Sequence, residues 1–287
     1  MGRVAYVNGR FVPHREAAVH IEDRGYQLAD AVYEVWSVMG GRLADAEGHF
    51  ARLERSLEAL RIPQPMSRRA LELVLREALR RNRVKEGLIY LQVSRGVAPR
   101  DHAFPGEHVV PAVVITAKSL DRAASEAKAA KGVGVVTTPE NRWGRCDIKT
   151  VSLLPNVLAR QQAKEAGAYE AWFVDELGMV TEGAASNAWI LDADGVLRTR
   201  DTNANILRGV TRRTLMEVIG ETGLPFHERP FTVQEAKQAR EAFVTGAGAL
   251  VLPVTSIDGA KVGDGQPGPV ATRLRRLYMD RVRATAS

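Results

Sequence analysis

The segment around Lys149 constrains the fold and chemistry of this chain more than any other part of its sequence. Lys149 lies in the stretch Arg145-Cys146-Asp147-Ile148-Lys149, and Pro155 follows six residues later, within a helix predicted over residues 152–167. Proline fits the first turn of a helix because the opening N–H groups have no intrahelical partner there. We therefore expect Lys149 to occupy a short turn held by rigid neighbours.

A lysine placed among apolar side chains and near a cation such as Arg145 loses part of its proton affinity. Its neutral amine can then attack a carbonyl group and form a Schiff base. A lone lysine near a helix start is nevertheless more often an ordinary surface residue. The assignment of Lys149 therefore depends on the rest of the chain.

The composition excludes several classes of protein. With 287 residues, 45% apolar and 26% charged, the chain has the make-up of a folded globular protein. Neither a signal-peptide pattern nor a run near the roughly 18 apolar residues of a membrane span is present, so we expect a cytoplasmic protein that does not bind membranes. Cys146 is the single cysteine, which excludes an internal disulfide and a cysteine-rich metal site, and no metal is expected.

The net charge of +6 raises the question of nucleic-acid binding. Arginine is interleaved with glutamate over residues 51–61 and 68–83, a pattern typical of solvated helix faces. We expect this charge to attract small anionic substrates and not nucleic acid. A basic, noncatalytic anion-binding or RNA-binding protein remains the alternative from another functional class.

The first part of the chain alternates strand and helix patterns. Asn8-Gly9 predicts a tight hairpin between strands at 4–7 and 10–12, because this pair supplies positive φ angles. Residues 21–27 are predicted as a polar connection, and residues 32–39 as a strand with Tyr33 on one face and Glu34 on the other. Helices are predicted from His49 and over 67–82, followed by strands over 88–93 and 109–117.

Residues 95–105 form a turn-rich loop with two side chains that can carry positive charge, Arg100 and His102. Functional residues are more frequent on such loops than on strands. We place a domain boundary near residue 121, after which a connector or short helix leads to a strand over 132–138.

Three further positions in the second part suit a cofactor. Glu182 precedes small residues, so a flat ring can approach its carboxylate closely. A helix predicted to begin near Val210 and Thr211 offers free N–H groups to a phosphate. The strand that ends at Gly246 and Ala247 offers the same phosphate a second contact.

Taken together, these motifs resemble the D-amino-acid transaminases, which are fold type IV pyridoxal-phosphate enzymes. The resemblance rests on the Lys149 segment, on Val-Tyr-Glu-Val after Asp-Arg-Gly-Tyr-Gln, and on Arg-x-His-x-Phe-Pro, and it extends in matching order over nearly the whole chain. It implies an α/β (α+β) fold with a small N-terminal domain over residues 1–120 and a larger domain over 121–287 that binds pyridoxal 5′-phosphate. It also implies a homodimer with the cofactor at the domain interface.

The resemblance further implies roles for individual residues. Lys149 would hold the cofactor as a Schiff base and move the substrate's Cα proton, and Glu182 would keep the pyridine nitrogen protonated. The implied substrate contacts are Tyr33, Arg100 and His102, with the Arg100 loop reaching the neighbouring subunit's active site. The other implied cofactor contacts are Arg52, Ser186, Leu207, Val210, Thr211, Gly246 and Ala247.

The implied reaction moves an amino group between D-amino acids, such as D-alanine or D-glutamate, and 2-oxo acids. The chain departs from the pattern where Ala184-Ala185 and Gly246-Ala247 replace hydroxyl residues, which affects cofactor retention more than chemistry. Branched-chain aminotransferase, (R)-selective amine transaminase and aminodeoxychorismate lyase are the alternatives of the same fold. Arg100 and His102 argue against all three.

Overall fold

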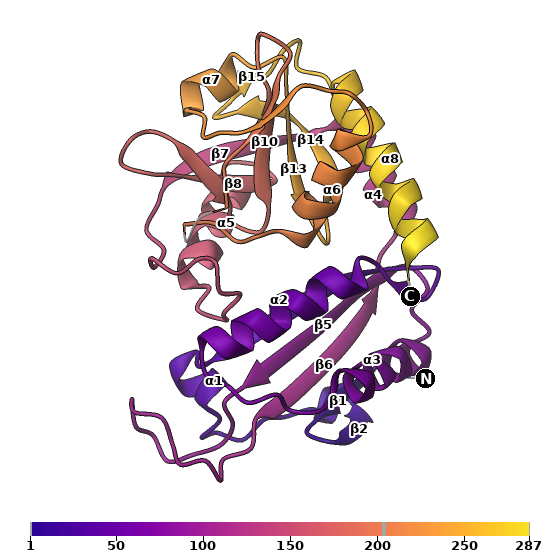
Figure 1. The fold of residues 1–287 in the computed structure, drawn as a ribbon, viewed down its shortest axis with the longest axis vertical. Coiled ribbons are helices and arrows are strands. Elements are labelled where there is room, and N and C mark those ends of the chain that lie inside the picture. The colour runs from indigo at the N-terminus through magenta and orange to yellow at the C-terminus, as the bar shows by residue number, and fades with distance from the viewer. Residues whose placement is uncertain (1, 203–204, 287) are drawn as a thin grey trace. The chain divides into compact units, whose positions relative to one another are not determined.

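The structure is a computed structural model that describes residues 2–202 and 205–286 (Figure 1). The chain divides into two compact units. The first contains residues up to Asp121, the short segment Ile148–Ser152 and the C-terminal residues from Thr285; the second contains Arg122–Asp147 and Leu153–Ala284. We expected the segment Ile148–Ser152 to belong to the second domain. In the structure this segment, which contains Lys149, belongs to the first unit.

In the first unit an antiparallel sheet has the strand order β2-β1-β6-β5-β3-β4. The predicted hairpin is confirmed, with Asn8 and Gly9 at φ angles of 44° and 92° in its turn. The strands are β1 Val4–Val7, β2 Arg10–Pro13, β3 Ala31–Met39, β4 Arg42–Leu43, β5 Gly87–Ser94 and β6 Ala112–Ser119.

Two long helices of this unit, α2 (Ala46–Ala59) and α3 (Arg68–Asn82), share one hydrophobic core with the sheet. Leu57 of α2, Leu75 of α3 and Trp36 of β3 are fully buried in this core. A 3-10 turn, His14–Glu16, and the short helix α1, Arg24–Leu28, complete the unit. The prediction of a plain polar connection at 21–27 was wrong for α1, which begins where the Asp23 carboxylate accepts hydrogen bonds from two backbone N–H groups.

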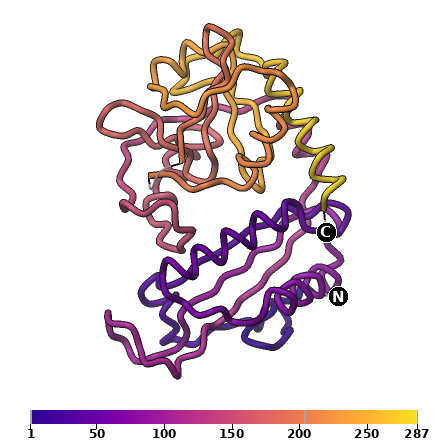
Figure 2. The backbone as a smooth tube through the Cα atoms, in the orientation of Figure 1, coloured from indigo at the N-terminus to yellow at the C-terminus, as the bar shows by residue number. Residues whose placement is uncertain are grey.

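The connection between β5 and β6 is long, and the backbone trace extends well beyond the ends of these strands before it returns (Figure 2). This connection contains Arg100 and His102, and both side chains are exposed.

The second unit is built on a mixed sheet with the order β12-β11-β10-β13-β14-β7-β8-β9, to which β15 adds beside β14. The pairs β11/β12, β14/β7 and β7/β8 are parallel, and the other pairs are antiparallel. The strands are β7 Val133–Pro139, β8 Glu170–Val174, β9 Val180–Gly183, β10 Asn187–Leu191, β11 Leu197–Thr199, β12 Phe226–Glu228, β13 Glu241–Gly246, β14 Leu250–Ile257 and β15 Ala260–Lys261.

The helices of the second unit are α4 Arg122–Lys131, α5 Leu154–Glu165, α6 Val210–Gly220, α7 Val233–Lys237 and α8 Pro269–Thr285. Pro155 lies in the first turn of α5, as predicted. Buried aromatic side chains fill the sheet faces, and Trp189 stacks on Phe243 with ring centroids 5.4 Å apart. Across the part of the chain that is described, no helix has both the length and the apolar character needed to cross a membrane.

Candidate active site

The backbone of Lys149 is fixed on two sides within the first unit. The carbonyl of Lys149 accepts a hydrogen bond from Tyr33 N at 3.0 Å, and Val151 N donates to Ala31 O at 3.1 Å, so the segment pairs with the first residues of β3, while β4 pairs with its last two residues. Lys149 N donates to the Ser56 hydroxyl of α2 at 3.3 Å. The short turn predicted for Lys149 is thus attached to β3 and α2 through backbone groups.

The Lys149 side chain lies over an aromatic face. Its Nζ is 4.2 Å from the centre of the Tyr33 ring, a cation–π distance. Tyr33 in turn stacks on Tyr90 of β5 with ring centroids 5.7 Å apart, and burial raises the pKa of Tyr90 to about 12. The first unit therefore brings together two of the predicted site residues, Lys149 and Tyr33.

Arg52, predicted to contact a phosphate, is buried on α2 and forms an ion pair with Glu34, which belongs to the same unit. Its Nε and Nη2 donate to the two oxygens of Glu34 at 2.7 and 2.8 Å. His49 Nδ1 lies 2.7 Å from Glu34 Oε2. This pairing fixes the direction of the guanidinium, and the contact with a phosphate stays a prediction.

The Glu34 carboxylate is held in its charged form by these neighbours. Burial alone would raise its pKa, but the positive charge of Arg52 and the hydrogen bonds from Arg52 and His49 hold the pKa far below its ordinary value of 4.5. Burial lowers the pKa of His49 despite its contact with Glu34. The sequence offered one signal for this cluster, because Glu34 shares the buried face of β3 with Trp36.

In the second unit, Glu182 at the end of β9 is 4% exposed and accepts hydrogen bonds from three residues. Arg142 Nη1 and Leu207 N donate to its Oε1 at 2.5 and 3.0 Å, and Asn187 Nδ2 donates to its Oε2 at 2.9 Å. Charged and well-aligned donors of this kind stabilise the carboxylate form. Two predicted residues, Glu182 and Leu207, are therefore in direct contact.

Arg142 was not predicted as part of the site. It lies between two carboxylates, because its Nη2 and Nε also donate to Glu140 at 2.6 and 2.8 Å. Burial opposes the charge of Arg142, but its hydrogen bonds and the charges of Glu140 and Glu182 raise the pKa of the guanidinium above its ordinary value. Arg142 thus provides a fixed positive charge beside Glu182.

The start of α6 suits a phosphate group. Gly209 precedes the helix without a side-chain cap, and the first-turn residues Val210 and Thr211 are buried. Buried N–H groups at a helix start need a partner, and an anion supplies one. Glycine is required at 209, because a Cβ there would lie 1.9 Å from Asn187 Oδ1. The chemistry of this helix start therefore fits the phosphate of the predicted cofactor.

Ser186 and Gly246 lie near one another beside this region. A Cβ on Gly246 would approach the Ala185 carbonyl at 3.1 Å and Ser186 Cα at 3.8 Å. The Ser186 hydroxyl donates to the buried Glu170 at 2.9 Å, and Ala185 N donates to the same oxygen at 3.2 Å. Glu170 thus holds the turn between β9 and β10, while Ala247 follows Gly246 in a half-buried position.

A metal-binding cluster or a reactive free thiol among the described residues would be a sign of another site. In residues 2–202 and 205–286, no cluster of three or more histidine, cysteine, aspartate or glutamate side chains could hold a metal ion. Burial raises the pKa of the Cys146 thiol to about 11, which makes it a poor nucleophile near neutral pH. Arg145 pairs with Asp147 through two hydrogen bonds of 2.9 and 3.0 Å.

Comparison with known proteins gives a consistent family. Residues 31–257 match the family described as amino-transferase class IV. The chain is 38% identical over 283 residues to a D-alanine aminotransferase of Staphylococcus haemolyticus, covering 98% of this chain and 99% of that protein. It is 40% identical over 275 residues to a D-alanine aminotransferase of Bacillus licheniformis, covering 96% and 95%.

A solved structure extends the comparison to the fold. A branched-chain amino acid aminotransferase of the organism abbreviated T.th., determined with pyridoxamine 5′-phosphate, superposes with a TM-score of 0.89 at 27% sequence identity. The match covers 99% of this chain and 95% of that one.

Proposed function

The chain belongs to the class IV aminotransferase family, and from this membership we propose that it is a pyridoxal-phosphate-dependent D-amino-acid transaminase. It transfers the amino group between D-amino acids, such as D-alanine and D-glutamate, and 2-oxo acids. The observation that carries the proposal is the 38% to 40% identity, over nearly the whole chain, to proteins named D-alanine aminotransferase. The branched-chain enzyme of the same fold is less similar, at 27%.

Three features of the described residues support the proposed cofactor. The uncapped start of α6 offers N–H donors to the phosphate, Glu182 offers a buried carboxylate to the pyridine nitrogen, and Lys149 offers an amine for covalent attachment. When bound, pyridoxal phosphate supplies an electron-withdrawing ring that stabilises negative charge at the substrate's Cα.

Lys149 has two roles in this proposal. Its amine would hold the cofactor, and Nζ would take the proton from the Cα of the donor amino acid and, in the reverse half-reaction, give a proton to the Cα of the amino acid formed from the 2-oxo acid. Both roles need a restricted amine. The backbone bonds of Lys149 to Tyr33 and Ser56, and the Tyr33 ring 4.2 Å from Nζ, limit where that amine can lie.

Glu182 would place a negative charge near the pyridine nitrogen of a bound cofactor, which would favour a proton on that nitrogen. Arg142, Asn187 and Leu207 N orient its carboxylate through hydrogen bonds. The Arg142–Glu140 ion pair restrains the arginine. A carboxylate that is 4% exposed needs such partners, because an unpaired buried charge is costly.

The choice of enantiomer depends on where the substrate carboxylate is anchored relative to Lys149. We assign this anchoring to Tyr33, Arg100 and His102. We further propose a homodimer, in which the exposed loop with Arg100 and His102 serves the neighbouring subunit's site. A cytoplasmic location fits the single, unpaired cysteine, and neither nucleic acid nor a membrane is required as a partner.

Arg100→Ala is expected to raise KM for D-amino acids and 2-oxo acids alike by about tenfold or more, because a charge-assisted hydrogen bond to the carboxylate is lost. Steady-state kinetics with D-alanine and a 2-oxo acid measures this change. Arg10→Ala, on the exposed end of β2, is the matched control and should leave KM unchanged.

The subunit arrangement is tested by mixing Arg100→Ala chains with Lys149→Ala chains and isolating the heterodimer. One of its two sites should then combine an intact Lys149 with an intact loop from the partner, so KM should return to the value of the unmodified protein. Heterodimers that keep the raised KM of the Arg100→Ala protein would exclude a site shared between subunits.

A further inference from the structure

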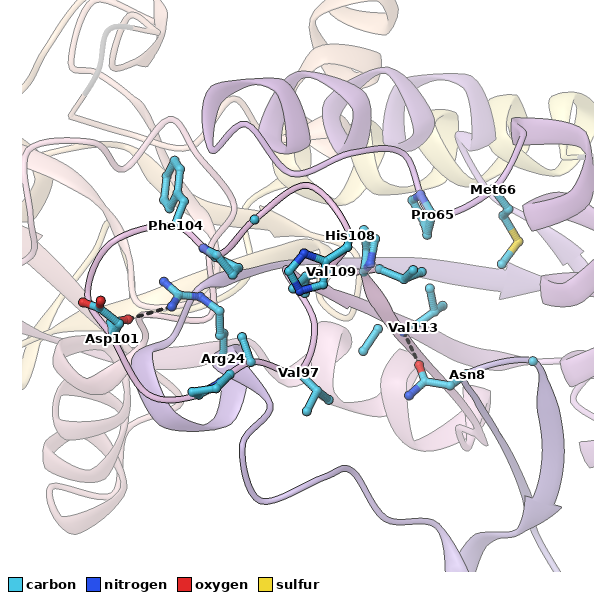
Figure 3. A pocket seen from close by; sticks show the side chains of 18 of the residues that line it. Asn8, Arg24, Pro65, Met66, Val97, Asp101, Phe104, His108, Val109 and Val113 are labelled. Atoms are coloured by element: carbon cyan, nitrogen blue, oxygen red, sulfur yellow. Dashed lines mark hydrogen bonds between the residues drawn. The ribbon is translucent and has the colours of Figure 1, made fainter.

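The loop that carries Arg100 and His102 is fixed at two points which bracket His102. At the first, Arg24 Nη1 donates to the carbonyl oxygen of Asp101 at 2.6 Å, a bond visible in Figure 3. At the second, the ring of Phe104 lies over the Arg95 guanidinium, with Cζ 3.7 Å from the ring centre. Both contacts lie within the first unit.

The two arginines that make these contacts are themselves fixed by one carboxylate. Arg24 Nε and Arg95 Nε both donate to Asp30 Oδ2, at 2.8 and 2.7 Å, and Arg95 Nη2 donates to Asp30 Oδ1 at 3.0 Å. Both arginine side chains are less than a tenth exposed. Asp30 directly precedes β3, so the loop is attached to the base of the strand that carries Tyr33.

Arg95 has no freedom to follow the loop if the loop moves. Besides Asp30, it donates to the carbonyls of Leu60 and Arg61 at 2.7 and 2.8 Å. The Arg61 guanidinium adds a second cation, 4.7 Å from the centre of the Phe104 ring. The Phe104 ring is therefore within cation–π distance of two arginines, and the Arg95 side chain is 7% exposed, where cation–π attraction is stronger than at the surface.

The loop lines a cavity of about 930 Å³. In Figure 3, Met66 and Val113 lie on one side of this cavity, and Asp101 and Phe104 lie on the other. Phe104 itself is 48% exposed. The start of the loop is fixed by a backbone hydrogen bond from Ala98 N to Glu22 O at 3.3 Å, and the contacts at Asp101 and Phe104 fix its later part.

We propose that Phe104, held by Arg95 and Arg61, together with the Arg24 contact to the Asp101 carbonyl, positions Arg100 and His102 for the substrate carboxylate. The proposal rests on the proposed function and deepens it. Phe104 is a positioning residue here, since its ring acts through the loop and does not touch the substrate.

The test compares Phe104→Leu with Phe104→Tyr in the holoenzyme. Leucine keeps an apolar side chain but removes the aromatic face, so KM for D-alanine and for the 2-oxo acid should rise roughly fivefold with kcat little changed. Tyrosine keeps the face and should behave as the parent does. Val110→Ala, at an exposed position of the same loop, is the matched control and should change neither constant.

A second measurement needs no substrate. Trypsin cleavage between Arg100 and Asp101, followed by the masses of fragments 1–100 and 101–287, should be several times faster in Phe104→Leu than in the parent, Phe104→Tyr or Val110→Ala. The cleavage rate tests whether Phe104 positions the loop even if the parent fails to react with D-amino acids. Such a failure would overturn only the proposed function.

Two outcomes contradict the proposed role of Phe104. One is a Phe104→Leu protein with the parent's KM and cleavage rate. The other is equal impairment of the leucine and tyrosine variants, which would mean that the aromatic face is not what holds the loop.

Discussion

Lys149→Ala is expected to fold normally and to lose transamination by about 10²- to 10⁴-fold from the missing proton transfer alone. The fold should persist because Lys149 is attached to β3 and α2 through its backbone N–H and carbonyl, which alanine retains. The chemistry should fail because the amine that holds the cofactor and moves the Cα proton is gone.

Borohydride reduction of the holoenzyme, followed by peptide mapping, locates the attached lysine. Lys164→Ala is the matched control, since Lys164 is an exposed lysine on α5 and should be dispensable. Cofactor found on a lysine other than Lys149 in the parent protein would overturn the assignment.

Glu182→Gln is expected to lower kcat by about 10²-fold while the cofactor still binds, as when one preorganised electrostatic contact is removed from an active site. Glutamine preserves the shape of the side chain, but its one carbonyl oxygen can accept from Leu207 N or from Asn187, because these donors bond different oxygens of Glu182. It removes the negative charge that balances a protonated pyridine nitrogen and that pairs with Arg142.

Single-turnover rates and the absorption spectrum of the loaded protein measure this effect. Glu140→Gln is the matched control, because it removes a charge from the same arginine and leaves Glu182 in place. A Glu182→Gln rate within a few-fold of the parent rate would show that the carboxylate does not control the ring's charge.

The sequence predicted those elements that depend on the preferences of neighbouring residues. The Asn8-Gly9 turn, the two helices over the first sheet and Pro155 at the start of α5 follow from backbone preferences within a few residues. The helix α1 was missed because its signal is a single capping aspartate, Asp23, in a short polar stretch.

The contacts that define the site depend on residues far apart in the sequence. Arg142 and Glu182 are joined by an ion pair, although 40 positions separate them, because Arg142 follows β7 and Glu182 lies on β9, and both strands flank β8 in the sheet. The periodic patterns in the sequence do not predict that contact. Family motifs predicted Glu182 but not the arginine that pairs with it. The assignment of Ile148–Ser152 to the first unit also depends on contacts between residues far apart in the sequence.

Arg52 illustrates the same limit from another side. The motif indicates an arginine, and a guanidinium suits a phosphate. Its bidentate pairing with Glu34, 18 positions earlier, appears only when β3 and α2 are packed together. A glutamate on the buried face of a strand requires a cation or a donor nearby, and this requirement was the available signal.

Initial rates with the two enantiomers of alanine test whether the protein transfers amino groups from D-amino acids. The purified protein, loaded with pyridoxal phosphate, is given D-alanine or L-alanine with the same 2-oxo acid, and the new amino acid is quantified. D-alanine should react much faster than L-alanine. Equal rates, or faster reaction of the L-form, would contradict the proposed preference for D-amino acids.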